Sequence, residues 1–233
     1  LRTVTGVQTC ALPISTLFGE LNLEITERSS VIGGIWESET NLQLQEEVWF
    51  NQIYQDLKNH PFPTVVDVGS GTGCLSLFNK NIKFPIFSFE PNFEAFKELI
   101  MNVWNNKCNT LCYNLGLGEK TKVSYLTKHP ELWGYGYNRV VDDKTEDQID
   151  IAPLDLILPV NIEVTHVKID VEGYEMFVLK GMDRILDKKP VLYLEMIEGN
   201  FNQYGYGSDE ILNFLGKYDY NYFQIDEHNY KFI

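Results

Sequence analysis

The stretch Val65–Gly73 (VVDVGSGTG) decides the fold of this chain. Its first four residues are apolar except for Asp67, which is the pattern of a buried strand. Three glycines follow at alternate positions, and glycine lets a backbone turn sharply and approach a ligand closely. The dinucleotide fingerprint G-x-G-x-x-G would need a further glycine where the chain has Cys74. The loop is therefore either a plain strand-to-helix turn or a ligand loop of another kind.

Short apolar runs alternate with helical patterns along the rest of the chain. An amphipathic helix is predicted over 41–58. Further strands are predicted at 64–68, 84–89, 110–113, 164–169, 191–194 and 220–225, and helices at 93–103, 174–186 and 208–217. Such alternation is typical of βαβ units, so we expect an α/β fold with a mostly parallel sheet and helices on both faces. The last thirteen residues could form a hairpin around 226–229.

Length and composition fit one soluble domain. The chain has 233 residues, of which 44% are hydrophobic and 22% charged. No apolar run approaches the roughly 20 residues of a membrane helix. A net charge of −14 argues against nucleic acid or a bare membrane as partner, because such a surface repels phosphate groups.

The N-terminus needs separate treatment. Val4–Ser15 (VTGVQTCALPIS) resembles a translated sequencing adapter, and the chain begins at Leu1 without an initiator Met. We expect residues 1–15 to be a non-native leader, with an ordinary short leader as the alternative. The remaining cysteines, Cys74, Cys108 and Cys112, have neither metal-binding spacing nor a disulfide framework, so we expect a reducing, cytoplasmic location.

The order Asp67-x-Gly69-x-Gly71-x-Gly73 resembles the first motif of class I methyltransferases, which bind S-adenosylmethionine. That ligand presents a sulfonium, an amino group and a ribose in place of a pyrophosphate. A carboxylate at Asp67 can face the amino group, and Glu90, at the end of the second strand, can accept hydrogen bonds from the ribose hydroxyls. Taken alone, Glu90 could also be an acid that favours a helix N-terminus.

Four blocks together resemble the FkbM-type methyltransferase family over about residues 60–225: FSFEPN (Phe87–Asn92), PLDLIL (Pro153–Leu158), VKIDVEGYEMFVLKGMDRIL (Val167–Leu186) and PVLYLEM (Pro190–Met196). The resemblance implies a Rossmann-like class I methyltransferase fold, with a seven-stranded sheet and an antiparallel strand near the C-terminus. It also implies methylation that depends on S-adenosylmethionine, usually of a hydroxyl oxygen. Many members read Gly-Ala-Asn after the strand acid, where this chain has Gly69-Ser70-Gly71; the cofactor loop stays plausible with that change.

This resemblance divides the chain into a methyltransferase domain over 61–233 and an N-terminal extension over 16–60 with one amphipathic helix. The abrupt end at Ile233 could leave the final strand cut short. Cofactor contacts are expected from the glycine loop and the strand ends: Asp67, Gly69, Ser70, Gly71, Gly73, Glu90, Pro91, Asn92, Asn114 and Asp170.

Strand alternation puts His166, Lys168 and Asp170 on one face of the strand at 164–169. Methyl transfer to an alcohol needs orientation, electrostatic stabilisation and a group that accepts the hydroxyl proton. We expect Asp170 to lie near the sulfonium and the acceptor, and Glu172 to act as the base or to anchor the acceptor. Lys168 is expected to pair with these acids and keep them ionised.

Structural roles are the alternatives for these residues. Glu172 could simply favour the first turn of the next helix, and Lys168 could make a structural ion pair. That helical role is the one we expect for Glu175, and we expect His166 to be a core histidine. Glu195, at the end of the next strand, could join Asp170 and Glu172 around a Mg²⁺-like ion, although we assign no metal ligands.

The methyl acceptor is expected at two loops rich in Tyr and Gly, 129–144 and 202–209, which could also be plain connections. A sugar hydroxyl, a polyketide or lipid hydroxyl and a small metabolite all stay open, as does the oligomeric state. Two competing hypotheses are a nicotinamide-dependent oxidoreductase on a similar sheet and a catalytically silent nucleotide-binding module.

Overall fold

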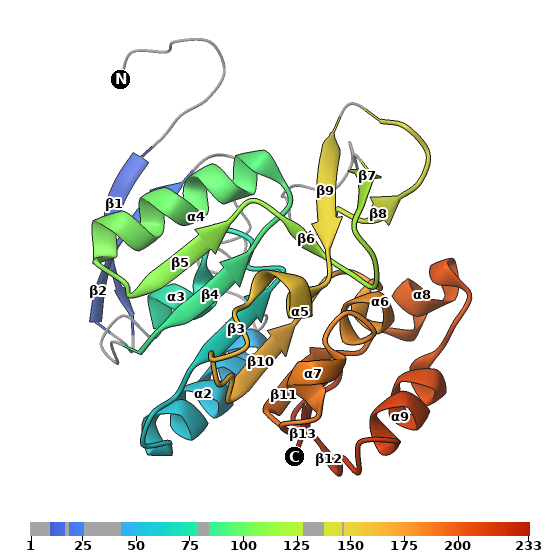
Figure 1. Ribbon diagram of the computed structural model, residues 1–233. Helices are drawn as coiled ribbons and strands as arrows, with labels where there is room; N and C mark the ends of the chain where they lie inside the picture. Colours follow the sequence, from blue (N-terminus) through green and yellow to red (C-terminus); the bar gives the residue numbers. More distant parts are fainter. Residues whose placement is uncertain (1–9, 17–18, 26–42, 79–83, 128–137, 146) are drawn as a thin grey trace.

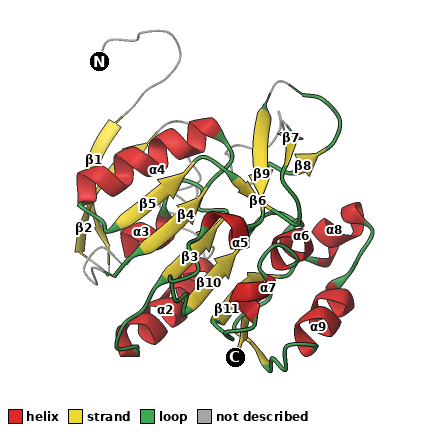
Figure 2. Ribbon diagram, in the orientation of Figure 1, coloured by secondary structure: helices red, strands yellow, loops and turns green. Residues whose placement is uncertain are grey.

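The computed structural model describes residues 10–16, 19–25, 43–78, 84–127, 138–145 and 147–233, and its centre is a seven-stranded sheet (Figures 1 and 2). The sheet order is β12-β13-β11-β10-β3-β4-β5. Parallel pairs join β11, β10, β3, β4 and β5, whereas β13 runs antiparallel to both of its neighbours. The strands are β3 (Val65–Val68), β4 (Ile86–Phe89), β5 (Thr110–Tyr113), β10 (His166–Ile169), β11 (Val191–Glu195), β12 (Tyr222–Gln224) and β13 (Asn229–Phe232). The predicted sheet and the predicted C-terminal hairpin are thus confirmed.

The order of the strands reverses between β3 and β10. From β3 the chain proceeds outward to β4 and β5, and from β10 it proceeds outward in the other direction to β11. The register places Asp67 beside Lys168 and Val68 beside Ile169. In open α/β sheets ligands bind outside the carboxyl ends of the strands at such a reversal. This edge is therefore the place to look for the site.

Helices cover both faces of the sheet, as predicted. On one face α2 (Gln43–Asn59) and α3 (Cys74–Phe78) pack on β3, β4 and β11 through a cluster of Trp49, Phe50, Ile53, Leu57, Val65, Leu75, Phe84, Ile86 and Tyr193. On the other face a larger core contains buried residues of α5 (Leu154–Ile157), α6 (Glu175–Leu179), α7 (Asp183–Leu186), α8 (Glu198–Phe201) and α9 (Ser208–Gly216). Helix α4 (Phe93–Asn106) lies along β5, and its N-cap is Asn92.

A second, four-stranded sheet was not predicted. It has the order β6-β9-β7-β8 and lies beyond the end of β5 (Figure 1). Its strands are β6 (Gly116–Leu117), β7 (Lys122–Leu126), β8 (Val140–Val141) and β9 (Gln148–Ala152). Two of these strands have only two residues, which is too short for a hydrophobic period to be recognised.

The single helix predicted over 174–186 is wrong in its middle, where two short helices, α6 and α7, are separated at Gly181. A Cβ atom at Gly181 would overlap the carbonyl oxygen of Gly118, so this backbone packs directly on the turn after β6. The carbonyl of Gly181 also accepts a hydrogen bond from the backbone of Asp155. Packing between distant segments, rather than local propensity, ends α6. The 3₁₀ helix η3 (Asn202–Tyr204) follows α8.

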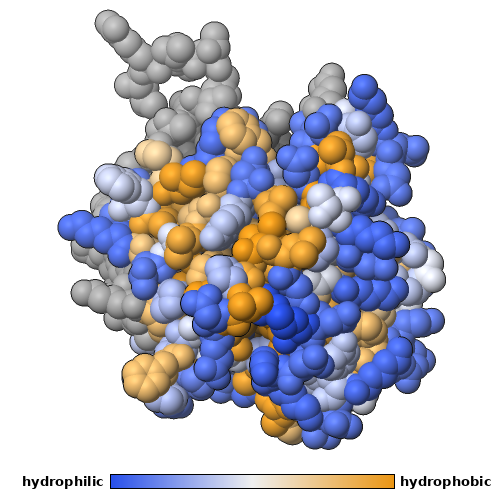
Figure 3. Space-filling model, in the orientation of Figure 1, coloured by the Kyte–Doolittle hydropathy of each residue, from blue (hydrophilic) through white to orange (hydrophobic). Residues whose placement is uncertain are grey.

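Two antiparallel strands, β1 (Cys10–Thr16) and β2 (Gly19–Ile25), form a separate hairpin near the N-terminus. This pairing does not test the prediction of a non-native leader over 1–15, which stays a prediction. Within the described ranges, Cys74, Cys108 and Cys112 are thiols and form no disulfide. Among the helices that the structure describes, none has the length and apolar character to cross a bilayer. In Figure 3 hydrophilic side chains cover much of the face formed by α6 to α9, in line with the acidic composition.

Candidate functional site at the carboxyl ends of β3 and β10

The glycine loop after β3 lies directly against the end of β10. Gly69, Gly71 and Gly73 have φ angles of 74°, 52° and 98°, which only glycine adopts without strain. A Cβ atom at Gly69 would overlap the carbonyl oxygen of Asp170. The backbone N–H groups of Gly69 and Ser70 both donate to the carbonyl of Phe89, at 3.0 and 3.1 Å. The loop therefore passes between β4 and β10 with glycine at the position where the backbone of Asp170 comes closest.

Asp67 is a buried acid whose charge is only partly compensated. Its side chain is 1% exposed, and within the described residues neither carboxylate oxygen has a hydrogen-bond partner. The nearest cation is the Lys168 Nζ atom, 3.5 Å from Oδ1. Burial raises the pKa of Asp67, because a charged carboxylate is costly away from water. A buried acceptor of this kind suits a positively charged ligand group.

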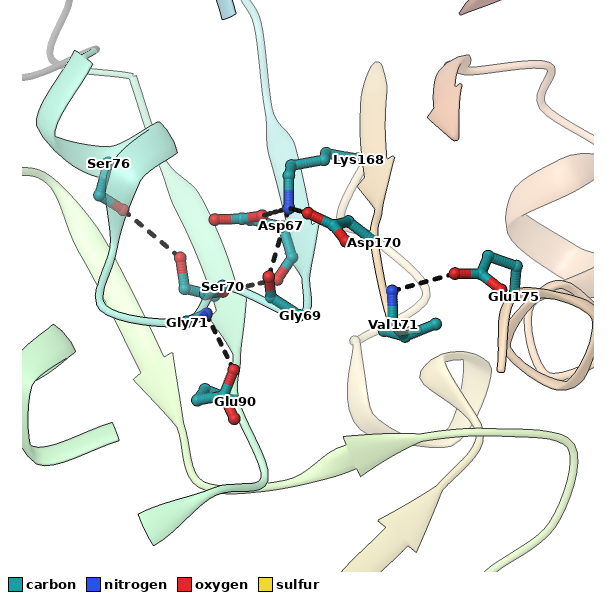
Figure 4. A network of polar contacts seen from close by, with 11 residues as sticks. Asp67, Gly69, Ser70, Gly71, Ser76, Glu90, Lys168, Asp170, Val171 and Glu175 are labelled. Atoms are coloured by element: carbon teal, nitrogen blue, oxygen red, sulfur yellow. Dashed lines mark hydrogen bonds and ion pairs between the residues drawn. The ribbon is translucent and has the colours of Figure 1, made fainter. Parts of the chain in front are cut away.

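Lys168 ties the two strand ends together (Figure 4). Its Nζ atom lies 3.1 Å from Oδ2 of Asp170 and donates a hydrogen bond to the carbonyl of Gly69 at 3.2 Å. The indole of Trp49, on α2, lies 5.4 Å from the same ammonium. Burial alone would lower the pKa of Lys168, but the carboxylates of Asp170 and Asp67 outweigh it and hold the pKa above its usual value. Lys168 is therefore a fixed positive charge.

Glu90 holds the far side of the loop. Its Oε2 atom accepts a hydrogen bond from the N–H of Gly71 and its Oε1 atom from the N–H of Asn92, both at 2.8 Å. Burial raises the pKa of Glu90 to about 7. Each carboxylate oxygen has two lone pairs, so both can still accept a hydroxyl hydrogen.

Two residues that we predicted as cofactor contacts, Asn92 and Asn114, hold the backbone around Glu90. The Asn92 side chain caps α4 by accepting hydrogen bonds from the N–H groups of Glu94 and Ala95. The Asn114 amide donates to the carbonyls of Glu90 and Pro91, at 2.9 and 3.0 Å. Their predicted cofactor contacts stay predictions.

The turn after β10 presents a glutamate in a left-handed backbone conformation. Glu172 has a φ of 55° and is followed by Gly173 at 101°. Its Oε2 atom accepts a hydrogen bond from the Asn200 amide at 2.9 Å. Burial, and then the negative charges of Asp170 and Glu175, raise the pKa of Glu172 to about 8. The expectation that Lys168 keeps Glu172 ionised is wrong, because the ion pairs of Lys168 in the described residues are with Asp67 and Asp170.

Glu175 begins α6, as expected, but its side chain also supports this turn. Its Oε1 atom accepts a hydrogen bond from the backbone N–H group of Val171 at 3.1 Å (Figure 4) and one from that of Gly173 at 3.3 Å. The side chain is 1% exposed, and burial raises its pKa to about 7. Glu175 is thus a buried acid behind Glu172.

Three carboxylates converge at the ends of β10 and β11. One oxygen each of Asp170, Glu172 and Glu195 lies within 4.8 Å of the others. Burial, and then the charges of Asp170 and Glu172, raise the pKa of Glu195 to about 10. Such a grouping arises around a metal ion and equally around a cationic organic ligand, so we assign no metal site.

His166 and the tyrosines of the 202–209 loop have structural contacts. His166 is buried as expected; its ring meets His60 edge-on, and burial lowers its pKa to about 4. The hydroxyl groups of Tyr204 and Tyr206 donate to the carbonyls of Val140 and Gly173, at 2.9 and 2.6 Å. An acceptor role for this loop stays a prediction. Residues 129–137 of the other predicted acceptor loop, 129–144, lie outside the described residues.

Sequence reasoning missed three residues that shape the site: Trp49, Arg139 and Asn200. Trp49 was visible as part of the amphipathic helix, but its partner Lys168 is far away in the sequence. The pairing of Arg139 with Asn200 comes from tertiary structure and has no local signal.

Comparison with known proteins gives the family. The methyltransferase FkbM domain matches residues 67–222, which include the glycine loop, β10, its turn and β11. "Methyltransferase 1" of Beauveria bassiana (strain ARSEF 2860) is 28% identical over 170 residues, which cover 60% of this chain and 66% of that protein. The chain thus spans just under two thirds of the length of this relative.

Solved structures are more distantly similar. A putative rRNA methylase from Clostridium thermocellum is 10% identical, with a TM-score of 0.49, and the match covers 79% of this chain and 93% of that one. Magnesium protoporphyrin IX methyltransferase from Synechocystis PCC 6803, solved with bound S-adenosylmethionine, is 12% identical, with a TM-score of 0.47, over 88% and 90% of the two chains. These likenesses are too weak to carry an argument, so the assignment depends on the sequence match over 67–222 together with the sheet order and the glycine loop. The chain belongs to the methyltransferase FkbM domain family and carries an S-adenosylmethionine-dependent methyltransferase domain.

Proposed function

We propose that the protein transfers the methyl group of S-adenosylmethionine to a hydroxyl oxygen of a small-molecule, sugar or lipid-like acceptor. The observation that carries this proposal is Glu172, a carboxylate held at the end of β10 among other acids, with a pKa of about 8. A hydroxyl acceptor must lose a proton as its oxygen gains a methyl group, and a raised carboxyl pKa makes a stronger base near neutral pH.

The residues present fit the cofactor. S-adenosylmethionine supplies an electrophilic methyl group on a positively charged sulfur. The buried carboxylate of Asp67, whose oxygens lack hydrogen-bond partners in the described residues, suits the amino group of the ligand. Glu90 can accept hydrogen bonds from ribose hydroxyls, and the glycine loop leaves room for close approach.

The acids at the end of β10 can divide the work. Asp170 is ion-paired with Lys168 at the end of β10, a place suited to a nearby cation. Lys168 cannot act as the base, because the same carboxylates hold it protonated. Glu172 is bonded through one oxygen to Asn200, which leaves its Oε1 atom to accept the proton of the acceptor.

The carboxyl groups at the carboxyl ends of β3, β10 and β11 narrow the class of acceptor. Asp67, Asp170, Glu172, Glu175 and Glu195 lie near one another, and their ion pairs in the described residues are those of Lys168. Carboxyl groups offer an anionic acceptor little compensation, and Lys168 is already paired, whereas a neutral hydroxyl compound can hydrogen-bond to them. This supports a sugar, a lipid-like alcohol or an uncharged metabolite over a phosphorylated or carboxylated one.

Methyl-label transfer tests the proposal. The protein is incubated with S-adenosylmethionine labelled in its methyl group and an extract of source cells, and the labelled product is identified by mass spectrometry and NMR. We expect the label on an oxygen. A label on nitrogen, carbon or sulfur would overturn O-methylation while leaving the methyltransferase family in place.

Matched variants give the control. Glu172→Gln should stop labelling, whereas Glu163→Gln, an exposed glutamate just before β10, should label at the wild-type rate. Equal labelling by Glu172→Gln and the wild type would remove Glu172 from the proposed role.

A further inference from the structure

Two residues outside the recognised sequence motifs, Arg139 and Asn200, are linked to Glu172 by hydrogen bonds. Arg139, just before β8, donates from Nη2 to the Asn200 Oδ1 atom at 2.8 Å, and Asn200, on α8, donates from Nδ2 to the Glu172 Oε2 atom at 2.9 Å. Asn200 is 7% exposed. Three segments that are far apart in the sequence thus form one chain of hydrogen bonds that ends at the carboxylate.

Arg139 fixes which way the Asn200 amide points. An asparagine amide can be rotated to exchange its oxygen and nitrogen, but guanidinium only donates and an ionised carboxylate only accepts. In the rotated state the amide N–H group would face Arg139 and the amide oxygen would face Glu172, so both contacts would be lost. Arg139 therefore holds Asn200 in the orientation that presents a donor to Glu172.

The backbone of the turn is held just as firmly. The N–H groups of Val171 and Gly173 donate to Glu175, and the Tyr206 hydroxyl donates to the carbonyl of Gly173 at 2.6 Å. A Cβ atom at Gly173 would come within 2.6 Å of the carbonyl oxygen of Asn200, so α8 packs directly on the turn. The main chain around Glu172 is thus fixed by Glu175, Tyr206 and the packing of α8, and one carboxylate oxygen of Glu172 is fixed by Asn200 of α8.

The Asn200 amide lies between Arg139 and Glu172, and this affects how basic the Glu172 carboxylate is. The charged groups that face Glu172 are Asp170 just after β10, Glu175 on α6, Glu195 on β11 and, beyond the Asn200 amide, Arg139. A direct pair with arginine would commit both carboxylate oxygens and hold the acid strongly ionised. An asparagine in between uses one oxygen and keeps the arginine at a distance, which leaves the carboxylate basic.

We propose that Arg139 and Asn200 are positioning residues, which aim the carboxylate of Glu172 at the acceptor through one oxygen while leaving its other oxygen open to take a proton. This inference rests on the proposed function, in which Glu172 is the base. It adds to that function two residues that orient the base: Arg139, just before β8, and Asn200, on α8.

The test titrates Glu172 directly in the protein without cofactor or acceptor. Infrared difference spectra of the carboxyl stretch are recorded from pH 5 to 10, and the Glu172 signal is the one that Glu172→Gln removes. We expect a midpoint of about 8 in the wild type. Asn200→Ala removes a donor that favours the charged form, and Arg139→Gln removes a positive charge and the constraint on the amide, so both midpoints should move to higher pH.

Gln203→Ala is the matched control. Gln203 accepts a second guanidinium hydrogen bond of Arg139, from Nη1 at 2.8 Å, while the hydrogen bond to Glu172 comes from Asn200. We expect this variant to keep the wild-type midpoint. If Asn200 and Arg139 only stabilised the fold, their variants would lower the melting temperature without moving the Glu172 midpoint.

Transfer measurements separate the two proposals. In the labelling assay Asn200→Ala and Arg139→Gln should lower the rate by about tenfold to a hundredfold, because a misplaced base costs rate even where binding is intact. An unmoved midpoint in both variants would overturn the positioning role. A wild-type labelling rate in Glu172→Gln would instead overturn the role of Glu172 as the base in the proposed function, whatever the midpoints are.

Discussion

The turns after β3 and β10 lie side by side and differ in the residue that adopts the left-handed conformation. In the first, the left-handed position is filled by Gly69, at a φ of 74°. In the second, it is filled by Glu172, at 55°, and the glycine comes one residue later. The first turn removes side chains where the backbone of β10 comes close. The second turn has a strained backbone at Glu172, and the Glu172 side chain lies at the edge of the sheet.

The comparison shows that the backbone is strained at Glu172 and not at Gly69. A left-handed conformation costs an L residue about 1 to 2 kcal/mol relative to glycine. Strained residues persist where the surroundings hold them and are often found at functional sites. Lys107, at the C-cap of α4, is also left-handed, at 54°, but it is exposed and lies at a helix end, where this conformation is common. The hydrogen bond of the half-buried Glu172 to Asn200 distinguishes the two positions.

The largest effect of a substitution is expected at the first turn. In Gly69→Ala the new Cβ atom would overlap the carbonyl oxygen of Asp170 at a positive φ, so the loop and β10 must separate. We expect a loss of about 4 kcal/mol in the free energy of unfolding and no measurable binding of S-adenosylhomocysteine. Urea denaturation and calorimetry measure these two quantities.

Gly216→Ala is the control for that change, because a Cβ atom there meets nothing within 4 Å. It should bind the ligand like the wild type. Wild-type binding in Gly69→Ala would show that the two turns do not need to touch.

The acids of the second turn should make stability fall as pH rises. The folded pKa values of Glu175 and Glu172, about 7 and 8, are higher than the value near 4.5 of an unfolded chain. The folded state therefore holds protons that the unfolded state has released, and the free energy of unfolding decreases from pH 4.5 to about 8. We expect a loss on the order of 5 kcal/mol between pH 5.5 and 8.5 in urea denaturation, because the extra protons of the two groups, summed over this range, correspond to about four pH units.

Glu175→Gln sharpens this expectation, because the amide oxygen can still accept both backbone hydrogen bonds but carries no charge. Its stability should depend less on pH than that of the wild type. A wild-type stability that rises across this range would contradict the raised pKa values.

The two turns also differ in how far the sequence predicts them. The glycine loop, Asp67 and Glu90 are local signals, because alternating glycines and acids at strand ends can be read one segment at a time. The sheet follows from the same alternation of strands and helices. The second turn cannot be read in this way: KIDVEGYE suggests a charged strand end, but the roles of Asn200, Arg139 and Trp49 arise from contacts across tens of residues. The small sheet and the break at Gly181 were missed for the same reason.

The smallest effect is expected when the left-handed residues Glu172 and Lys107 are each replaced by glycine, which compares the backbone strain at the two positions. Glu172→Gly should raise the free energy of unfolding by about 1 kcal/mol at pH 8, because the strained conformation and the repulsion from neighbouring acids both disappear. The same change should abolish methyl transfer. Lys107→Gly should stabilise by a similar amount and leave transfer unchanged. If Glu172→Gly is destabilising at pH 8, the turn is not under strain.

The most direct test of the account measures binding and chemistry together in Glu172→Gln. Calorimetry with S-adenosylhomocysteine gives the cofactor affinity, and labelled methyl transfer into the acceptor of the source-cell extract gives the rate. The account predicts an affinity within about threefold of the wild type and a transfer rate lower by about a hundredfold or more, because only the proton acceptor has been removed. Transfer at the wild-type rate with unchanged affinity would contradict the role of Glu172 as the base.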